Sequence, residues 1–211
     1  MPFFDIHSHR TASNTLTNVL LGVENLPKTG GSYSVGFHPA HSSILDIDLL
    51  QQAACAKNVW AIGECGLDSF VKTVDLTTQK QVFLAHIAVA ETVGKPVIIH
   101  CVKQYQELIA LKKKRQPNVP LLVHGFAKNQ KIADELLKNG FYLSFGANLL
   151  LENHPILAVF KTVPLERLFL ETDNSELPIS LIYEKAATLR TILVADLHQA
   201  ISENKKKVFG K

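Results

Sequence analysis

The sequence predicts an α/β fold, an abbreviated (β/α) barrel in which the first outer helix is missing. Short apolar segments alternate along the chain with segments of helical periodicity, a pattern typical of parallel strands joined by helices. Counting the apolar segments gives about eight strands, the number in a complete barrel. The first two connections are too short for helices, and 211 residues is at the lower limit for such a barrel.

The first half of the chain begins with a strand at residues 3–9, where Phe3 and Phe4 lead into a period of two. A polar turn at residues 10–14 ends it. The further elements expected in this half are a strand at 19–23, a break at Gly30-Gly31, a strand at 33–39, a helix from Ser43 to about Ala56 opened by a capping box of Ser43 and Asp46, and a strand at 59–64 that runs on to Asp68.

The second half alternates more regularly. Its longest helix, from about Thr77 to Val93, carries Phe83 and Ile87 on one apolar stripe. Gly94 ends this helix and Pro96 begins the next strand, which is the usual order of a helix stop and a strand start. Further strands are expected at 97–100, 120–124, 141–145 and 168–173, and further helices at 104–114, 130–138, 155–161 and from 179 to the C-terminus.

The composition indicates a single globular domain over residues 1–211, with 46% hydrophobic and 19% charged residues. The net charge of +3 neither predicts nor excludes nucleic-acid binding, because a local patch matters more than the sum. The three cysteines lack zinc-finger spacing, and free thiols in a reducing cytoplasm are expected. The N-terminus lacks signal-peptide features and no segment is long enough to span a membrane, so we expect a soluble cytoplasmic protein without membrane partners.

Polar residues recur at one structural place, the C-terminal end of an apolar strand. His7 and His9 lie two apart on a strand, so their imidazoles face the same side and form a chelating pair. In an α/β barrel all such strand ends meet on one face, where active sites lie. The full set at these ends is His7, His9, His38, Glu64, His100, His124 and Asp173. Imidazoles and carboxylates in this number predict a centre for two divalent metal ions with a bridging carboxylate.

The same segments resemble the motif series of a known family. The motifs are Asp5-Ile6-His7-Ser8-His9, Gly36-Phe37-His38-Pro39, Ile62-Gly63-Glu64-Cys65-Gly66-Leu67-Asp68, Pro96-Val97-Ile98-Ile99-His100, His124-Gly125-Phe126 and Leu170-Glu171-Thr172-Asp173. In this order, over nearly the whole chain, they resemble the TatD family. Its members are metal-dependent hydrolases, often DNases, with an amidohydrolase-like TIM barrel.

The resemblance implies a role for each matching residue. His7 and His9 would bind one metal together with Asp173, His100 and His124 would bind the second, and Glu64 would bridge the two. A water between the cations would become the nucleophile, and Asp173 would accept its proton as general base. Glu64 and Asp173 are therefore the catalytic candidates. The ions expected are two of Mg, Mn, Zn, Ni or Co.

Two further residues at the mouth have open roles. His38 is predicted to bind a substrate phosphate or leaving group, and the alternative is a hydrogen bond with a structural purpose. Asp68 either orients a ligand histidine from behind or caps its own loop.

The chain departs from the family at the mouth. The segment between His9 and His38 is shorter than in the family, and Val102 stands where the family often carries an arginine. Gly125 and Ala127 replace a more polar run, and the chain enters a helix almost directly after Asp173. These changes leave the metal ligands intact but remove groups that would hold a polyanion. Phosphodiester hydrolysis, with DNA as substrate, is the first functional prediction. The alternatives are a hydrolase of a small ester, amide or phosphoester, and a metal-stabilised binding protein without catalysis.

The remaining reactive residue types are assigned no site. The histidines outside the strand ends are expected at the surface or partly buried, namely His41, His86, His154 and His198. Cys65 and Cys101 each follow a ligand, and the alternation of a strand points them away from the mouth as small buried hydrophobes. The basic runs 112–115 and 205–207 are expected on solvated helix ends.

Overall fold

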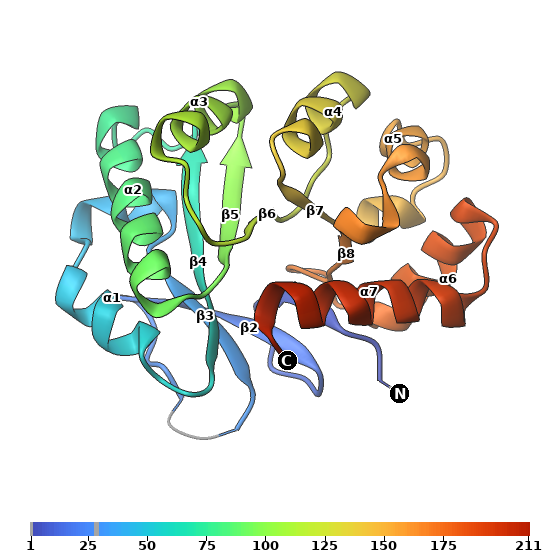
Figure 1. Cartoon of the computed structure of the whole chain (residues 1–211), viewed down its shortest axis with the longest axis horizontal. Helices are drawn as coiled ribbons and strands as arrows, with labels where there is room; N and C mark the ends of the chain where they lie inside the picture. The colour runs from blue at the N-terminus through green and yellow to red at the C-terminus, as the bar shows by residue number, and fades with distance from the viewer. Residues whose placement is uncertain (1, 28–29) are drawn as a thin grey trace.

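The computed structural model describes residues 2–27 and 30–211. Within these residues, eight parallel strands follow one another in chain order in a single sheet (Figure 1). The strands are β1 (Asp5–Ser8), β2 (Thr15–Leu20), β3 (Ser32–Gly36), β4 (Val59–Asp68), β5 (Val97–Val102), β6 (Leu121–Val123), β7 (Tyr142–Phe145) and β8 (Leu168–Leu170). The predicted eight-stranded α/β barrel is confirmed.

The sheet closes between β8 and β1, where the chain follows on from β8 to Asp173. The Asp173 amide donates to the His7 carbonyl oxygen at 2.9 Å, and the His9 amide donates to the Asp173 carbonyl oxygen at 3.2 Å. Below them, the Asp5 carboxylate accepts from the Thr172 amide at 3.0 Å and from its hydroxyl at 2.6 Å. The closure therefore lies at the C-terminal strand ends and fixes Asp173 beside the His7/His9 pair.

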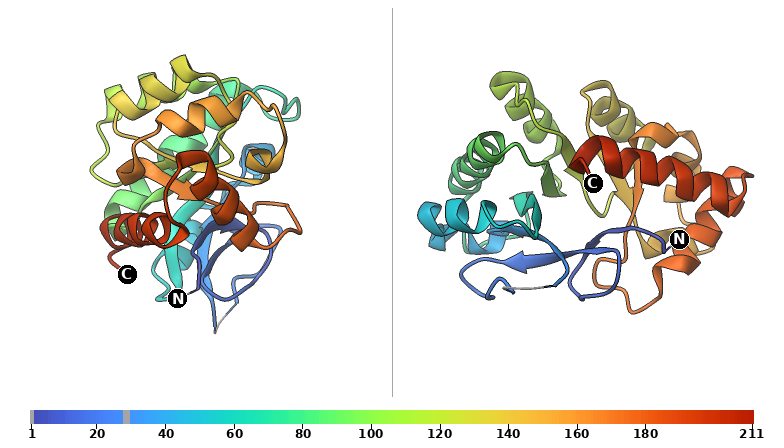
Figure 2. Two further views of the ribbon diagram at one scale, coloured as in Figure 1. Left: turned by 90° about the vertical axis from the view of Figure 1, so that its right-hand side faces the viewer. Right: turned by 60° about the horizontal axis from the view of Figure 1, so that its bottom comes forward.

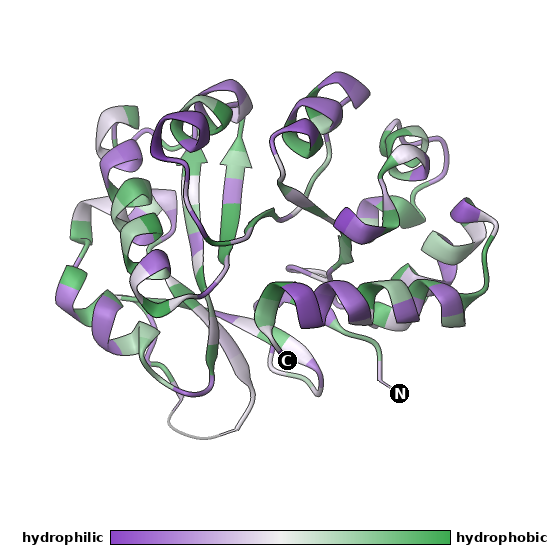
Figure 3. Ribbon diagram, in the orientation of Figure 1, coloured by the Kyte–Doolittle hydropathy of each residue, from purple (hydrophilic) through white to green (hydrophobic). Residues whose placement is uncertain are grey.

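Helices cover most of the outside of the sheet, and Figure 3 shows polar and apolar residues alternating along them. Their bounds are α1 (Ile47–Ala54), α2 (Leu76–Val93), α3 (Tyr105–Arg115), α4 (Gln130–Lys138), α5 (Ile156–Thr162), α6 (Ile179–Arg190) and α7 (Val194–Phe209), with short 3-10 helices η1 (Pro39–Ile44), η2 (Ala147–Leu150) and η3 (Leu165–Arg167). At the end of α7 (Figure 2), the Phe209 ring packs 5.9 Å from Phe4 and 6.3 Å from Phe169 between ring centroids. This contact places α7 at the N-terminal end of the barrel, away from the mouth.

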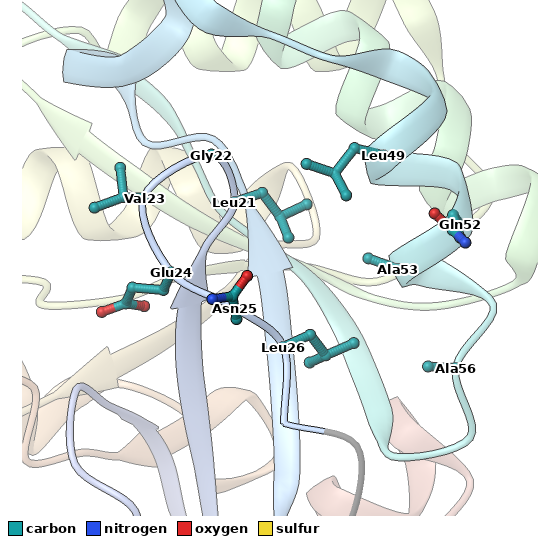
Figure 4. A pocket seen from close by; sticks show the side chains of 10 residues that line it. All are labelled: Leu21, Gly22, Val23, Glu24, Asn25, Leu26, Leu49, Gln52, Ala53 and Ala56. Atoms are coloured by element: carbon teal, nitrogen blue, oxygen red, sulfur yellow. The ribbon is translucent and has the colours of Figure 1, made fainter.

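The first two connections lack outer helices, as predicted. Residues 9–14 between β1 and β2 are not helical, and neither are the described residues between β2 and β3, which are 21–27 and 30–31. A hollow of about 420 Å³ remains between the second connection and α1, lined by Leu21, Leu26 and Leu49 (Figure 4). None of the candidate ligands lines this hollow.

Four predicted elements were wrong in detail. The second strand runs from Thr15 to Leu20 instead of 19–23. The apolar pattern missed its first half because the residues buried there include the polar Thr15, Thr17 and Asn18. The third strand runs from Ser32 to Gly36 instead of 33–39, because Pro39 already opens η1. The single helix expected from Ser43 is a 3-10 helix followed by α1, and Asp46 is itself the N-cap, accepting from the Leu49 amide at 2.9 Å. The last strand ends at Leu170, and Asp173 follows it as an isolated bridge to Ser8.

No helix in the described part of the chain combines the length and the hydropathy that crossing a bilayer requires.

Candidate metal centre

The polar residues predicted at the strand ends come together around Glu64. His7 and His9 come from the end of β1, His100 from β5, and His124 follows β6 directly. Glu64 itself lies where β4 changes register against β5, between Ile62 and Cys65. Such an irregularity re-aims a side chain, and here the buried Glu64 carboxylate faces the interior of the mouth.

The two oxygens of Glu64 face different histidines. Its Oε1 lies 2.8 Å from His100 Nδ1 and 2.8 Å from His124 Nε2. Its Oε2 lies 3.7 Å from both His7 Nε2 and His9 Nε2. One carboxylate thus stands between two separate pairs of imidazole nitrogens, which is the arrangement that a bridging ligand requires.

The pair His7/His9 shares a second carboxylate, Asp173. Its Oδ1 lies 3.6 Å from His7 Nε2 and 3.5 Å from His9 Nε2. These separations are too long for hydrogen bonds, but they suit ligands on one ion, which lie roughly 3–3.5 Å apart when each bond is about 2.1 Å. His7 is fully buried, and neither of its ring nitrogens has a hydrogen-bond partner. A buried nitrogen left without a partner among three other donor groups fits a metal ion.

Burial and neighbouring charge set the pKa values of this cluster. Desolvation lowers the pKa of His7 well below its ordinary value, and the nearby His124 adds to the effect. Burial alone would raise the pKa of Glu64, but His124 and the hydrogen bonds from His100 and His124 outweigh it and hold the pKa well below the usual range. The Glu64 carboxylate between the two histidine pairs therefore stays ionised.

Asp68 contacts His100 from the side opposite Glu64. Its Oδ2 lies 3.1 Å from His100 Nε2, while its Oδ1 accepts from the Phe70 amide at 2.7 Å. The two roles left open for Asp68 are both present, because one oxygen orients the histidine and the other caps the loop. The buried Gln79 of α2 accepts from the Asp68 amide at 2.7 Å and donates to its carbonyl oxygen at 3.1 Å, which fixes the end of β4.

His124 has a comparable partner in Glu171, which is fully buried. Glu171 Oε1 accepts from the Gly125 amide at 2.6 Å and lies 3.6 Å from His124 Nδ1. Burial alone would lower the pKa of His124, but the carboxylates of Glu64 and Glu171 outweigh it and raise the pKa well above its ordinary value. Glu171 lies in the Leu170-Glu171-Thr172-Asp173 motif, and its position two residues before Asp173, on the same side of an extended segment, was the signal available in the sequence.

His38 faces the centre and also holds its own loop. Its Nε2 lies 3.7 Å from Glu64 Oε1, and its ring centroid lies 4.4 Å from that of His100. Its Nδ1 accepts from the Ala40 amide at 3.1 Å and caps η1. Burial lowers the pKa of His38 to about 4. The side chain is thus a neutral imidazole at the mouth, and its assignment to substrate binding stays a prediction.

Asn18 of β2 was missed from the sequence. It is buried, its Oδ1 accepts from the Glu64 amide at 2.8 Å, and its Nδ2 donates to Glu64 Oε2 at 3.3 Å. The Ser34 hydroxyl of β3 donates to the same Asn18 oxygen at 3.2 Å. No motif or spacing marks Asn18, because it lies in the middle of a strand that the apolar pattern misplaced.

Among the residues assigned no site, His86 differs from its predicted partial exposure. It is fully buried on α2, with Nδ1 2.8 Å from the Val82 carbonyl oxygen and Nε2 accepting from the Phe37 amide at 2.9 Å. Cys65 and Cys101 are buried free thiols, as predicted, and burial raises the pKa of Cys101 to about 12.

The chain is similar to known proteins over most of its length. Residues 6–210 match the family described as TatD related DNase. The uncharacterized metal-dependent hydrolase YcfH of Escherichia coli K12 is 28% identical over 193 residues, which cover 84% of this chain and 73% of that protein. The 3'-5' ssDNA/RNA exonuclease TatD of Edwardsiella piscicida is 33% identical over 150 residues, covering 66% of this chain and 56% of that protein.

The fold is shared with a solved structure as well. The crystal structure of YJJV, a TatD homolog from Escherichia coli K12, matches with a TM-score of 0.82 and 21% sequence identity, covering 93% of this chain and 86% of that chain. The family match spans nearly the whole chain, and the candidate ligands predicted at the strand ends meet around Glu64. The chain therefore belongs to the TatD related DNase family of metal-dependent hydrolases.

Proposed function

We propose that this hydrolase cleaves phosphodiester bonds at a centre of two divalent metal ions, with DNA as its substrate. The observation that carries the proposal is the division of Glu64 between two nitrogen sets, with Oε2 toward His7 and His9 and Oε1 toward His100 and His124. The names of its relatives support a nucleic-acid substrate, since one of them is described as an exonuclease of single-stranded DNA and RNA.

The residues present supply a ligand set for each ion. His7, His9 and Asp173 would hold one ion, His100 and His124 the other, and Glu64 would give one oxygen to each. Mixed imidazole and carboxylate donors suit Mn, Co, Ni or Zn, and Mg is also used in phosphodiester chemistry. When bound, such ions lower the pKa of a water ligand and neutralise charge on phosphoryl oxygens.

The chain's own groups orient this set and move the proton. Asp68 is within hydrogen-bond distance of the far nitrogen of His100 and orients this ring, whereas Glu171 lies 3.6 Å from the far nitrogen of His124. Asp173 is the candidate general base, because its side chain is 36% exposed and reaches the solvent-facing mouth. Burial raises the pKa of Asp173 above its ordinary value, which makes the carboxylate a better proton acceptor.

Chelation tests the proposed function directly. Treatment with a chelator is expected to abolish cleavage of a labelled DNA strand, and added Mn, Mg, Zn, Ni or Co is expected to restore it. Glu64→Gln is expected to remove activity without unfolding the protein. Cleavage that continues after chelation, or an active Glu64→Gln variant, would contradict the proposal.

A hydrolase of a small ester, amide or phosphoester is the second candidate. The observation in its favour is a hollow of about 210 Å³ beside Asp173, lined by Gly125, Gly146 and Asn174 among others, which is small compared with typical ligand pockets. Metal-dependent turnover of small chromogenic esters, without cleavage of single-stranded or duplex DNA, would favour this candidate over a nuclease.

We also propose the cytoplasm as the compartment. Cys55, Cys65 and Cys101 are all free thiols. A reducing compartment keeps thiols in this state.

A further inference from the structure

An exposed aromatic side chain stands beside the metal centre. Phe70 follows the end of β4, and its side chain is 61% exposed. Its amide donates to Asp68 Oδ1 at 2.7 Å, and the other oxygen of the same carboxylate lies 3.1 Å from His100 Nε2. The Asp68 carboxylate thus links the Phe70 backbone to His100, a candidate metal ligand.

The loop that carries Phe70 is held in place on several sides. The Ser69 amide donates to the Val102 carbonyl oxygen at 3.2 Å, and the Gln104 amide group donates to the Ser69 hydroxyl. The Lys72 ammonium donates to the Ser69 carbonyl oxygen at 2.9 Å. An apolar ring on a loop tied down in this way stays exposed because the backbone holds it there, and a fixed exposed ring is suited to contact with a partner.

Positive charge lies beside the ring. The Lys103 ammonium sits 4.4 Å from the Phe70 ring centroid, a cation–π distance. Lys103 also lines a hollow of about 280 Å³ together with Lys128, and the Glu107 carboxylate that lines the same hollow is paired with Lys80 at 2.8 Å. Because Glu107 is paired with Lys80, the Lys103 and Lys128 ammonium groups of this hollow remain available to an anionic group.

We propose that Phe70 and Lys103 form a stacking platform that holds one base and the adjoining phosphate of a single-stranded DNA substrate at the mouth. An aromatic face with a neighbouring cation is the combination that proteins use to bind single strands without reading their sequence. The platform rests on the proposed phosphodiesterase function, and it requires an unpaired base because a base within a duplex does not expose its face.

The test compares two strands of equal length, an oligo-dT and a fully abasic strand, in the presence of Mn. Phe70→Ala is expected to raise KM for oligo-dT by about 5- to 150-fold with little change in kcat, because one base stack is lost. Its KM for the abasic strand is expected to stay that of wild type, and Phe70→Trp is expected to retain tight use of oligo-dT. Lys103→Ala is expected to raise KM for both strands, since it removes a phosphate contact.

Leu193→Ala is the matched control, because Leu193 is 69% exposed and precedes α7, a helix that carries none of the candidate ligands. Equal effects of Phe70→Ala on both strands, or no effect on either, would overturn the platform. If wild type cleaves neither strand, the phosphodiesterase proposal fails, and fluorescence anisotropy of labelled oligo-dT then decides the platform separately. Wild type must bind the strand more tightly than Phe70→Ala, and equal binding refutes the platform.

Discussion

Asn18 holds Glu64 at two points, with the Glu64 amide donating to Asn18 Oδ1 at 2.8 Å and Asn18 Nδ2 donating to Glu64 Oε2 at 3.3 Å. The first contact fixes the backbone at the irregular point of β4, and the second fixes the carboxylate that stands between the two histidine pairs. A buried amide with both of its groups directed at one residue acts as a clamp on that residue.

Replacing Asn18 is therefore expected to weaken metal binding. Asn18→Leu removes both contacts at similar volume, and we expect Mn affinity to fall about 10- to 100-fold, as for other groups that orient metal ligands. Calorimetric titration with Mn measures this, and thermal unfolding of the ion-free protein checks the fold. Ser34→Ala is the control, because it removes a hydrogen bond to Asn18 and leaves both contacts to Glu64. Equal Mn affinity in Asn18→Leu and Ser34→Ala would contradict the clamp.

Asp173→Asn is expected to lower kcat by about 10²- to 10⁴-fold, the usual contribution of a general base. The amide keeps an oxygen that faces His7 and His9 but does not accept the proton. Steady-state kinetics at saturating Mn measure the loss. His154→Gln, outside the centre, should leave kcat unchanged, and an Asp173→Asn variant with wild-type kcat would remove Asp173 from the chemistry.

The buried His86 imidazole is expected to make the stability of the folded protein depend on pH. Burial lowers its folded-state pKa to about 4, below the ordinary value of 6.5. The unfolded chain therefore binds more protons between these values, so the contribution of His86 is fully present above pH 6.5 and is lost as pH falls toward 4. The total is about 2–4 kcal/mol. Denaturant unfolding of the ion-free protein at several pH values measures this effect. As the pH falls, the free energy of unfolding should decrease less steeply in His86→Gln than in wild type. Identical slopes would contradict the prediction.

Gly66 has no room for a side chain. Its φ is 147°, and an added Cβ would overlap the His100 carbonyl oxygen on β5. Gly66→Ala is expected to cost about 3 kcal/mol or more, because backbone must move against backbone next to His100, a candidate metal ligand. Gly94 also has positive φ, but an added Cβ there meets nothing within 4 Å. Gly94→Ala should cost only about 1–2 kcal/mol, and chemical denaturation of both variants compares the two costs.

The sequence predicted the barrel because its strands are nearly all apolar and its turns are marked. The helix at 130–138 has the predicted bounds, since Asn129 caps it by accepting from the Ile132 amide at 3.1 Å. The sequence also predicted which residues meet at the mouth, because the C-terminal ends of parallel strands share one face of the barrel. Asn18 could not be found in this way, as a buried amide on β2 is recognisable only from its partners on β4. The buried His86 likewise accepts a hydrogen bond from the amide of Phe37, a residue distant in sequence, so this contact could not be recognised from the sequence.

Anomalous diffraction from crystals soaked in Mn tests the proposed centre of two ions bridged by Glu64. We expect two Mn peaks, one among His7, His9 and Asp173 and one between His100 and His124, with Glu64 between them. Anomalous maps without Mn at these residues, or with a single ion that Glu64 does not contact, would contradict it.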